Sequence, residues 1–132
     1  MRLDEKAEAA AGPLDTAQIA GVWLNADRGD SGGTLRLEVR DHGDGLRVRG
    51  YGVGEAGGEA IDWGETAAVA LAQTPDGDSA WAFTCAFDHG FMTTEVAAYG
   101  KEGILIAASY MTFTDGSGRT DYWTREFFHR DK

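Results

Sequence analysis

The sequence predicts an all-β fold, an antiparallel up-and-down β-barrel of about eight strands. Short runs rich in β-branched and aromatic residues recur along the chain, and such residues favour the pleated, half-buried surface of a sheet. Turn signals with Asp and Gly separate these runs every ~8–12 residues, a spacing typical of sandwiches and barrels. We expect a barrel rather than a β-sandwich, because sequential hairpins bring the last strand beside the first and leave no free edge.

The chain begins with a segment, residues 1–15, that we expect to form a short helix or a disordered tail. Its alanines favour a helix, and Gly12-Pro13 ends that helix. Asp15 or Thr16 can cap a single turn that leads into the first strand. The remaining residues, 16–132, have the length of one domain, so we expect a single barrel domain.

The clearest hairpin lies early in the chain. Residues 34–40 alternate strictly between aliphatic and charged side chains, as in a strand with one face buried and one in water. The Asp- and Gly-rich residues 41–45 reverse the chain, and the alternation continues through residues 46–51. We therefore expect Leu35 and Leu37 to face the core.

The other strands are assigned from the runs between turn signals. Residues 60–64 read as a short strand, and the alanine-rich residues 66–73 as a strand or a helix. Residues 79–87 place aromatic side chains and a cysteine on one face and Ala or Thr on the other. The Asp-Gly step at residues 115–116 supplies the positive φ angles of a tight reversal in the last hairpin. The further predicted strands are residues 21–25, 91–99, 104–113 and 120–130.

Composition limits the partners and the location that we expect. The chain has 22 acidic and 12 basic residues and a formal net charge of −10. Such a surface repels phosphate backbones and anionic headgroups, so we expect neither nucleic-acid nor membrane partners. No apolar run is long enough to cross a bilayer, and the N-terminus lacks the apolar core of a secretory signal. The lone Cys85 excludes an internal disulfide, and a cytoplasmic location is the expectation.

The last two strands predict a homo-oligomer. Residues 104–113 are largely apolar on both faces, and Phe127 and Phe128 point to opposite faces of their strand. A strand that is apolar on both sides must be covered on both sides. We expect a second subunit to cover it, in a symmetric dimer or tetramer through residues 104–113 and 120–130. The alternative is that the N-terminal segment covers the patch.

Residues 19–25, Ile-Ala-Gly-Val-Trp-Leu-Asn, resemble the first-strand motif of the calycins, the lipocalin and avidin-like barrels. The Gly-x-Trp with a following Asn is most similar to the avidin and streptavidin form. The resemblance implies that Trp23 closes one end of the barrel. It also implies that a basic residue of the last strand, Arg125 or Arg130, packs over that indole, as a guanidinium can.

The same resemblance suggests polar contacts for a ligand. In avidin-like proteins the asparagine after the tryptophan helps to bind the ureido group of biotin. Carried over to this chain, that role falls on Asn25, with Ser31 at a second ureido-binding position. The later tryptophan motifs of the avidins have no match in this sequence, so the resemblance is confined to one motif and the strand order.

These observations predict a non-catalytic protein that binds a small, mainly apolar or biotin-like ligand at the open end of its barrel. Aromatic walls with a few polar groups are typical of small-molecule pockets. We expect no metal and no cofactor, because the three histidines show no metal-ligand spacing. The candidate ligand-binding residues are Asn25, Ser31, Trp63, Trp81, Tyr99 and Tyr110.

Two other functions stay open. A small barrel enzyme of the cyclase or isomerase type needs an inward carboxylate or tyrosine, for which Glu95, Glu126 and Tyr110 are candidates. A structural or interaction module filled by its own side chains predicts no cavity and a large apolar interface. Nucleophilic catalysis by Cys85 with His89 is not expected, because four residues along a strand span about 13 Å.

Overall fold

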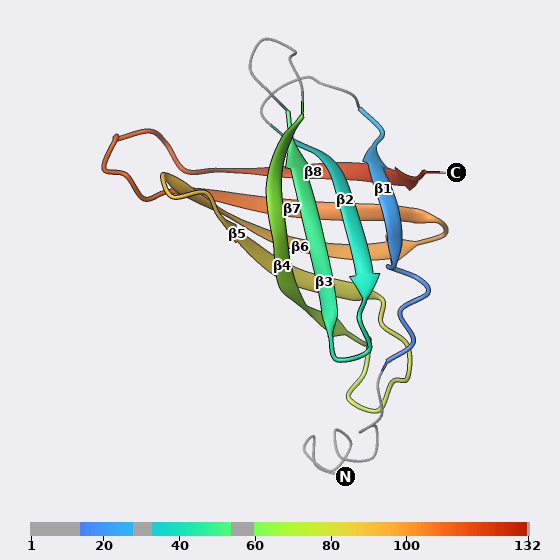
Figure 1. Cartoon of the computed structure of the whole chain (residues 1–132). Helices are drawn as coiled ribbons and strands as arrows, with labels where there is room; N and C mark the ends of the chain where they lie inside the picture. The colour runs from blue at the N-terminus through green and yellow to red at the C-terminus, as the bar shows by residue number, and fades with distance from the viewer. Residues whose placement is uncertain (1–13, 28–32, 54–59, 132) are drawn as a thin grey trace.

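The computed structural model describes residues 14–27, 33–53 and 60–131. It shows a closed barrel of eight antiparallel strands that pair in sequence order, which confirms the predicted fold class (Figure 1). The described residues include no helix long and apolar enough to span a membrane. Residues 1–13 of the predicted N-terminal helix or tail, residues 1–15, lie outside the described residues. The strands are β1 (Gly21–Asn25), β2 (Thr34–Asp41), β3 (Leu46–Gly52), β4 (Ile61–Leu71), β5 (Ala82–Asp88), β6 (Met92–Lys101), β7 (Ile104–Phe113) and β8 (Tyr122–Arg130).

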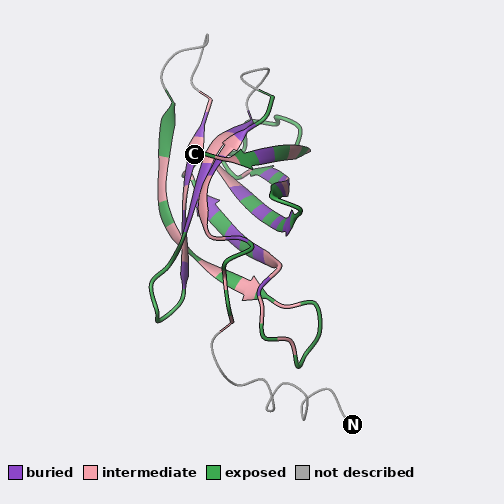
Figure 2. Ribbon diagram, turned by 90° about the vertical axis from the view of Figure 1, so that its right-hand side faces the viewer, coloured by how far each residue is buried: buried purple, intermediate pink, exposed green. Residues whose placement is uncertain are grey.

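The barrel closes between β1 and β8. Trp23 lies opposite Arg130, and Asn25 lies opposite Phe128. Along the strands, buried and exposed residues alternate (Figure 2), because successive side chains of a strand point to opposite faces. Trp23, Phe83 and Phe128 are the largest fully buried side chains. The expected contact between the end of the chain and the first strand is therefore confirmed.

A β-bulge changes the predicted alternation at the start of β2. Leu37 and Val39 are buried as predicted, whereas Leu35 is only half-buried and Thr34 is fully buried. The pairing with β3 shifts between Thr34 and Arg36, so Leu35 is the extra residue that a bulge inserts. The bulge thereby buries a hydroxyl side chain close to the end of the strand.

Residues that we predicted as two segments form one strand, β4. The pairing with β3 shifts at Trp63, and Gly64 has φ +84°, a conformation that residues with a Cβ rarely adopt. The bulge at these two residues lets β4 continue through the position where the alternation of side chains is interrupted. The helical alternative for residues 66–73 is wrong, because pairing with β3 and β5 overrides the high helix propensity of alanine.

A single turn before β1 closes one end of the barrel. The amide of Ile19 donates to the carbonyl of Thr16 at 3.0 Å, and Asp15 caps the turn by accepting from the amide of Ala17 at 2.9 Å. Ile19 is fully buried, and its carbonyl accepts a hydrogen bond from Nε1 of Trp23 at 2.9 Å. The predicted turn and its cap at Asp15 are confirmed.

Arg130 packs over Trp23 at this closed end. Its Cζ lies 4.5 Å from the centroid of the indole ring, and its guanidinium donates to the carbonyl of Ala17 at 2.7 Å. Arg125, the other candidate, instead lies 5.2 Å from the ring centroid of Phe127. The arrangement is compatible with a calycin-like fold.

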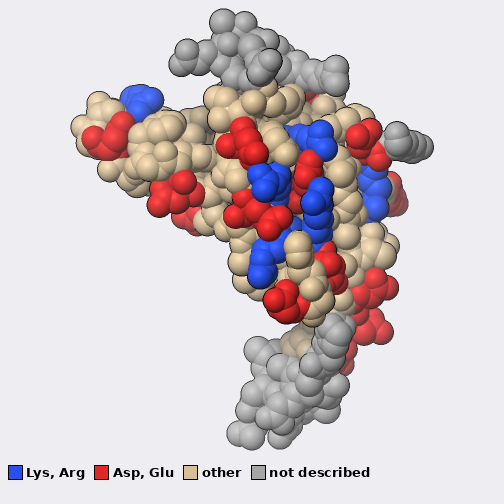
Figure 3. Space-filling view, in the orientation of Figure 1, with Lys and Arg blue, Asp and Glu red and all other residues tan. Residues whose placement is uncertain are grey.

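Charged side chains gather on the outer face of β2, β3 and β4 (Figure 3). Glu38 is buried between Arg36 and Arg40, and it forms ion pairs with both. Arg49 pairs with Asp62 across β3 and β4 at 2.8 Å. One side of the barrel is therefore covered by a solvated network of both signs.

Candidate functional site at the open end of the barrel

A cavity of about 440 Å³ lies at the end of the barrel opposite the closing turn. It forms because β1 ends at Asn25 while β8 continues: within the described residues, Tyr122 to Glu126 have no strand partner on the β1 side. The start of β2 and the bulged Leu35 face β8 across the resulting gap. We call this space the open-end cavity; it is lined by Asn25, Thr34, Leu35, Val53, Glu126 and Phe127, among others.

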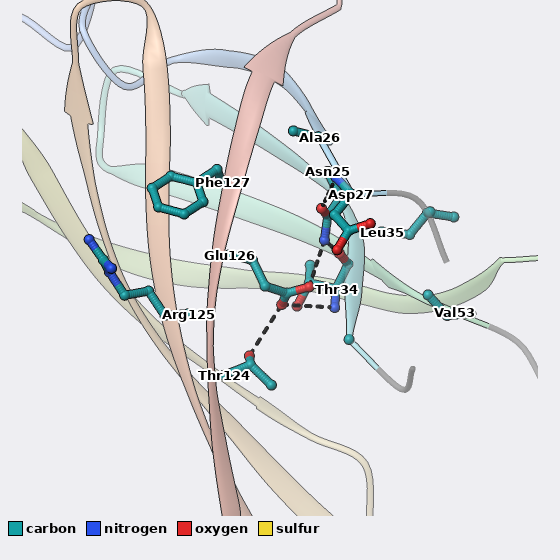
Figure 4. A pocket seen from close by; sticks show the side chains of 11 residues that line it. Asn25, Ala26, Asp27, Thr34, Leu35, Val53, Thr124, Arg125, Glu126 and Phe127 are labelled. Atoms are coloured by element: carbon teal, nitrogen blue, oxygen red, sulfur yellow. Dashed lines mark hydrogen bonds between the residues drawn. The ribbon is translucent and has the colours of Figure 1, made fainter. Parts of the chain in front are cut away.

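The carboxylate of Glu126 stands at the centre of the open-end cavity. It points from β8 toward β1 and β2 (Figure 4). Its Oε2 accepts a hydrogen bond from Nδ2 of Asn25 at 2.6 Å. Its Oε1 accepts from the Oγ1 of Thr124 at 3.2 Å and from the amide of Thr34 at 3.3 Å. Three donors from three strands therefore hold one carboxylate in place.

Asn25 positions this carboxylate and has little capacity left for a ligand. Its Nδ2 also donates to the carbonyl of Thr34 at 2.7 Å, and its Oδ1 accepts from the amide of Asp27 at 2.8 Å. Both donor hydrogens of the amide are used, and one acceptor lone pair remains. Asn25 thus lies in the cavity wall, as the sequence suggests. Its hydrogen bonds, however, stabilise the turn that follows β1 and hold the carboxylate of Glu126 in place.

Gly33 allows the close approach of backbone and carboxylate. A Cβ atom at this position would lie 2.5 Å from Oε2 of Glu126, well inside van der Waals contact. Any larger residue would therefore have to displace the carboxylate. The absence of a side chain at Gly33 is therefore needed for the observed position of the Glu126 carboxylate.

Two buried hydroxyls near the carboxylate lack a hydrogen-bond partner. Thr34, in the cavity wall, is 1% exposed, and its Oγ1 has no partner among the described residues. The Oγ of Ser109, which is buried opposite Thr124 on the neighbouring strand, is likewise unpartnered there. An unsatisfied buried hydroxyl costs free energy, so the Oγ1 of Thr34, which lines the cavity, is available to a group that enters it.

Glu126 has no cationic partner among the residues that the structure describes, although Arg125 is its neighbour in sequence. The guanidinium of Arg125 lies over Phe127, on the opposite face of β8 (Figure 4). Asp27 adds a second carboxylate to the lining. Arg125 also lines the cavity, but its guanidinium is turned toward Phe127. The side of the cavity at Glu126 therefore favours positive or N–H-bearing groups.

The predicted site residues do not form one site. Trp63 packs against Phe87 and His89, with ring centroids at 5.4 and 5.1 Å. Trp81 and Tyr99 line a surface hollow of about 710 Å³ near the closed end. Tyr99 is 43% exposed, and Tyr110, on the outer face of β7, is 50% exposed. Ser31 lies outside the described residues.

Of the two candidate acids, only one points inward. Glu95 is exposed on the outer face of β6, between the buried Thr94 and Val96, whereas Glu126 lines the open-end cavity. Sequence reasoning did not single out Thr34, Thr124 or Gly33 as site residues. A usable signal was the pair of polar residues at inward positions of β8, where the outward neighbours are aromatic or basic.

His89 belongs to the interior beside Trp63. Its Nε2 lies 2.9 Å from the Oγ1 of the buried Thr94. Burial lowers the pKa of His89, and the charge of Asp88 opposes this only in part. The native protein therefore disfavours the imidazolium.

This pKa shift predicts a loss of stability in mild acid. Below the ordinary histidine pKa of about 6.5 the unfolded chain binds a proton that the native chain resists, so the free energy of unfolding falls as pH falls. We expect His89→Gln to flatten the slope between about pH 7 and 5.5, and His42→Gln, in an exposed turn, to leave it unchanged. Urea unfolding over a pH series measures this, and equal slopes for wild type and His89→Gln would contradict it.

Cys85 is a core residue. Burial raises the pKa of its thiol to about 12, so the thiolate that would act as a nucleophile is scarce at neutral pH. We expect the native protein to react with a chromogenic disulfide reagent at least about a hundredfold more slowly than the urea-unfolded chain. Rapid stoichiometric labelling without denaturant would contradict this burial.

The geometry defines a small closed β-barrel with an acidic, partly apolar cavity at one end. Among the residues described, no three His, Cys, Asp or Glu side chains lie close enough together to hold a metal ion. Comparisons with protein-family models, with curated proteins and with solved structures found no match to the chain. The function must therefore be argued from the site itself.

Proposed function

We propose that this protein binds a small, mainly apolar ligand in the open-end cavity and holds it by an N–H group that donates to Glu126. The observation that carries this proposal is a carboxylate held by three donors beside the Oγ1 of Thr34. Within the described part of the chain, this carboxylate forms no ion pair and this hydroxyl has no hydrogen-bond partner. An amine, an amide or a ureido group has the required donor. The calycin-like architecture, with Trp23 under Arg130 at the closed end, supports a binding role.

The acceptor capacity of Glu126 supports the proposed ligand class. An ionised carboxylate offers about four lone-pair sites, and donors among the described residues occupy three. A ligand N–H takes the remaining site, and a positive charge on the ligand strengthens that hydrogen bond. Thr34 Oγ1 can donate to, or accept from, a second polar atom of the ligand.

The apolar part of the ligand has its own contacts. Leu35, Val53 and Phe127 line the same cavity, and the ring of Phe127 lies on the far side of β8 from the carboxylate (Figure 4). Small-molecule sites combine such walls with a few polar groups that fix orientation. The cavity volume of about 440 Å³ lies within the usual range for such sites, roughly 300–1,000 Å³.

Thermal-shift and calorimetric titration test the proposal. The probes are hydrophobic primary amines, cyclic ureas including biotin, and matched neutral hydrocarbons or ethers without an N–H. We expect N–H-bearing probes to stabilise the protein, and Glu126→Gln to weaken cationic probes by at least about tenfold. Glu65→Gln, on the exposed outer face of β4, should bind like wild type. Failure of every N–H probe to bind, or equal affinity in Glu126→Gln, would refute the proposal.

An inward carboxylate also favours a second candidate, an isomerase or cyclase in which Glu126 moves a proton. Its side chain lines a cavity and retains an acceptor site, as a general base requires. The two functions differ in what happens to the bound molecule. Incubation of a bound probe in deuterated water, followed by NMR, separates them: exchange or rearrangement that disappears in Glu126→Gln identifies catalysis, and unchanged probe identifies binding alone.

A further inference from the structure

We infer that the outer face of β4 to β8 docks a second copy of this chain in a two-fold dimer. This outer face carries exposed apolar side chains on four of its five strands, and we call it the apolar face. Monomeric proteins rarely expose large contiguous apolar surface without a partner. Its large exposed members are Val69, Leu71, Tyr99, Tyr110, Trp123 and Phe127.

The strand register arranges these side chains in adjacent rows. In one row Tyr110 lies opposite Trp123 across β7 and β8, and in another Tyr99 lies opposite Ile106 across β6 and β7. Between them, Thr84, Ala97 and Ala108 form a row of small residues. The two aromatic rows therefore flank a shallow groove lined by small side chains, and a second surface can approach closely there.

A hollow and a projecting ring lie on this same face. The hollow, of about 350 Å³, is bounded by Val69, Ala97 and Tyr110, among others. Trp123, on β8, is 62% exposed and stands roughly 10 Å from β6, at two strand spacings. A two-fold interface uses the same patch on both copies. The indole of Trp123 from each copy can therefore enter the hollow of the other. A knob and a hollow on one patch favour a second copy as the occupant.

The charges of the apolar face also favour a copy of the same chain. Within these rows, and counting only described residues, the charged side chains are Glu95 and Arg125. Neither forms an ion pair within its own copy among those residues. The whole chain carries a net charge of −10, but these rows are neutral. A two-fold axis passing over β7 can set Glu95 of each copy against Arg125 of the other.

The area of the apolar face is sufficient for a specific dimer. Five strands spaced by ~4.8 Å, over about six residues of ~3.3 Å, cover roughly 500 Å² per copy. Two such faces bury about 1,000 Å², the size from which a specific interface is expected. The opposite side of the barrel, with its ion-paired network around Glu38, offers no comparable surface.

Sedimentation velocity of the full chain over a wide concentration range tests the inference. We expect a concentration-dependent dimer, and we expect Glu95→Arg and Arg125→Glu each to weaken it by at least about tenfold. The double variant carries both charges exchanged and should restore association. Asp44→Arg, in the exposed turn between β2 and β3, is the control and should dimerise like wild type.

Circular dichroism is used to check that each variant is folded, so that loss of the dimer is not mistaken for unfolding. A wild-type chain that stays monomeric at every concentration overturns the inference. This is the result expected if residues 1–13 or a different protein covered the face. Single reversals that leave the dimer unchanged, or a double variant that fails to restore it, also overturn the proposed pairing. Arg125 and Phe127 also line the open-end cavity, so ligand binding is measured for each variant. Glu95→Arg, on β6 and outside that lining, distinguishes a failed dimer from a failed ligand site.

Discussion

Replacing Trp23 by alanine should lower the free energy of unfolding by about 3–5 kcal/mol, the usual cost of removing a large buried aromatic side chain. Trp23 is fully buried, donates to the carbonyl of Ile19 and lies under the guanidinium of Arg130. The variant loses all three contacts at once and leaves a cavity at the closed end. Urea denaturation followed by circular dichroism measures the change.

Trp23→Phe is the graded control for this prediction. Phenylalanine keeps most of the apolar packing but has no N–H to satisfy the carbonyl of Ile19. We expect a smaller loss, about 1–2 kcal/mol. A loss below about 1 kcal/mol in Trp23→Ala would contradict the role of Trp23 in closing the barrel.

Gly52→Ala should destabilise the open end by about 1–3 kcal/mol, the range for forcing extra volume into a packed interior. A Cβ at Gly52 would lie 2.6 Å from two atoms of the Trp63 indole. The indole cannot simply move away, because Gly50 approaches its other end and Phe87 and His89 pack against it. Thermal and urea unfolding, read by circular dichroism, measure the effect.

A double-mutant cycle identifies the cause of this destabilisation. If the clash is with the indole, Gly52→Ala should cost less than about 0.5 kcal/mol in a Trp63→Ala background. An equal cost in both backgrounds would contradict the clash and would point to the backbone of β3 instead. Because Trp63→Ala leaves a cavity of its own, the informative quantity is the difference between the two costs.

Local pattern was sufficient for most of the barrel. Alternating side chains and Asp–Gly turns predicted β3, β6, β7 and β8 close to their observed limits. The pattern was insufficient for β4, where Trp63 and Gly64 form a bulge that strand pairing alone creates. Alanine favours a helix in an isolated segment and is depleted in strands, so the hydrogen bonds of neighbouring strands decided the outcome against the local preference.

The candidate site was predicted only in part. Asn25 and Glu126 were recognised as polar residues of interest, and Trp63 does lie in the interior. Tyr99 and Tyr110 were expected beside them but lie on the outer face, because one step along a strand reverses the direction of a side chain. The arrangement of an aromatic residue as cavity wall or exposed surface depends on register, which composition does not contain.

The amino-acid sequence by itself determined that successive hairpins form an antiparallel barrel with Trp23 buried near one end. The hairpins follow from interactions between residues close in sequence and from the period of two along a strand. The place of Trp23 was implied by the calycin resemblance of residues 19–25. Only the tertiary structure decided the cavity, since it joins Glu126 to Asn25 and Thr34, residues about a hundred positions earlier in the chain. The position at which β1 ends against β8 determines which distant side chains meet in the cavity. That position is fixed only when the sheet closes.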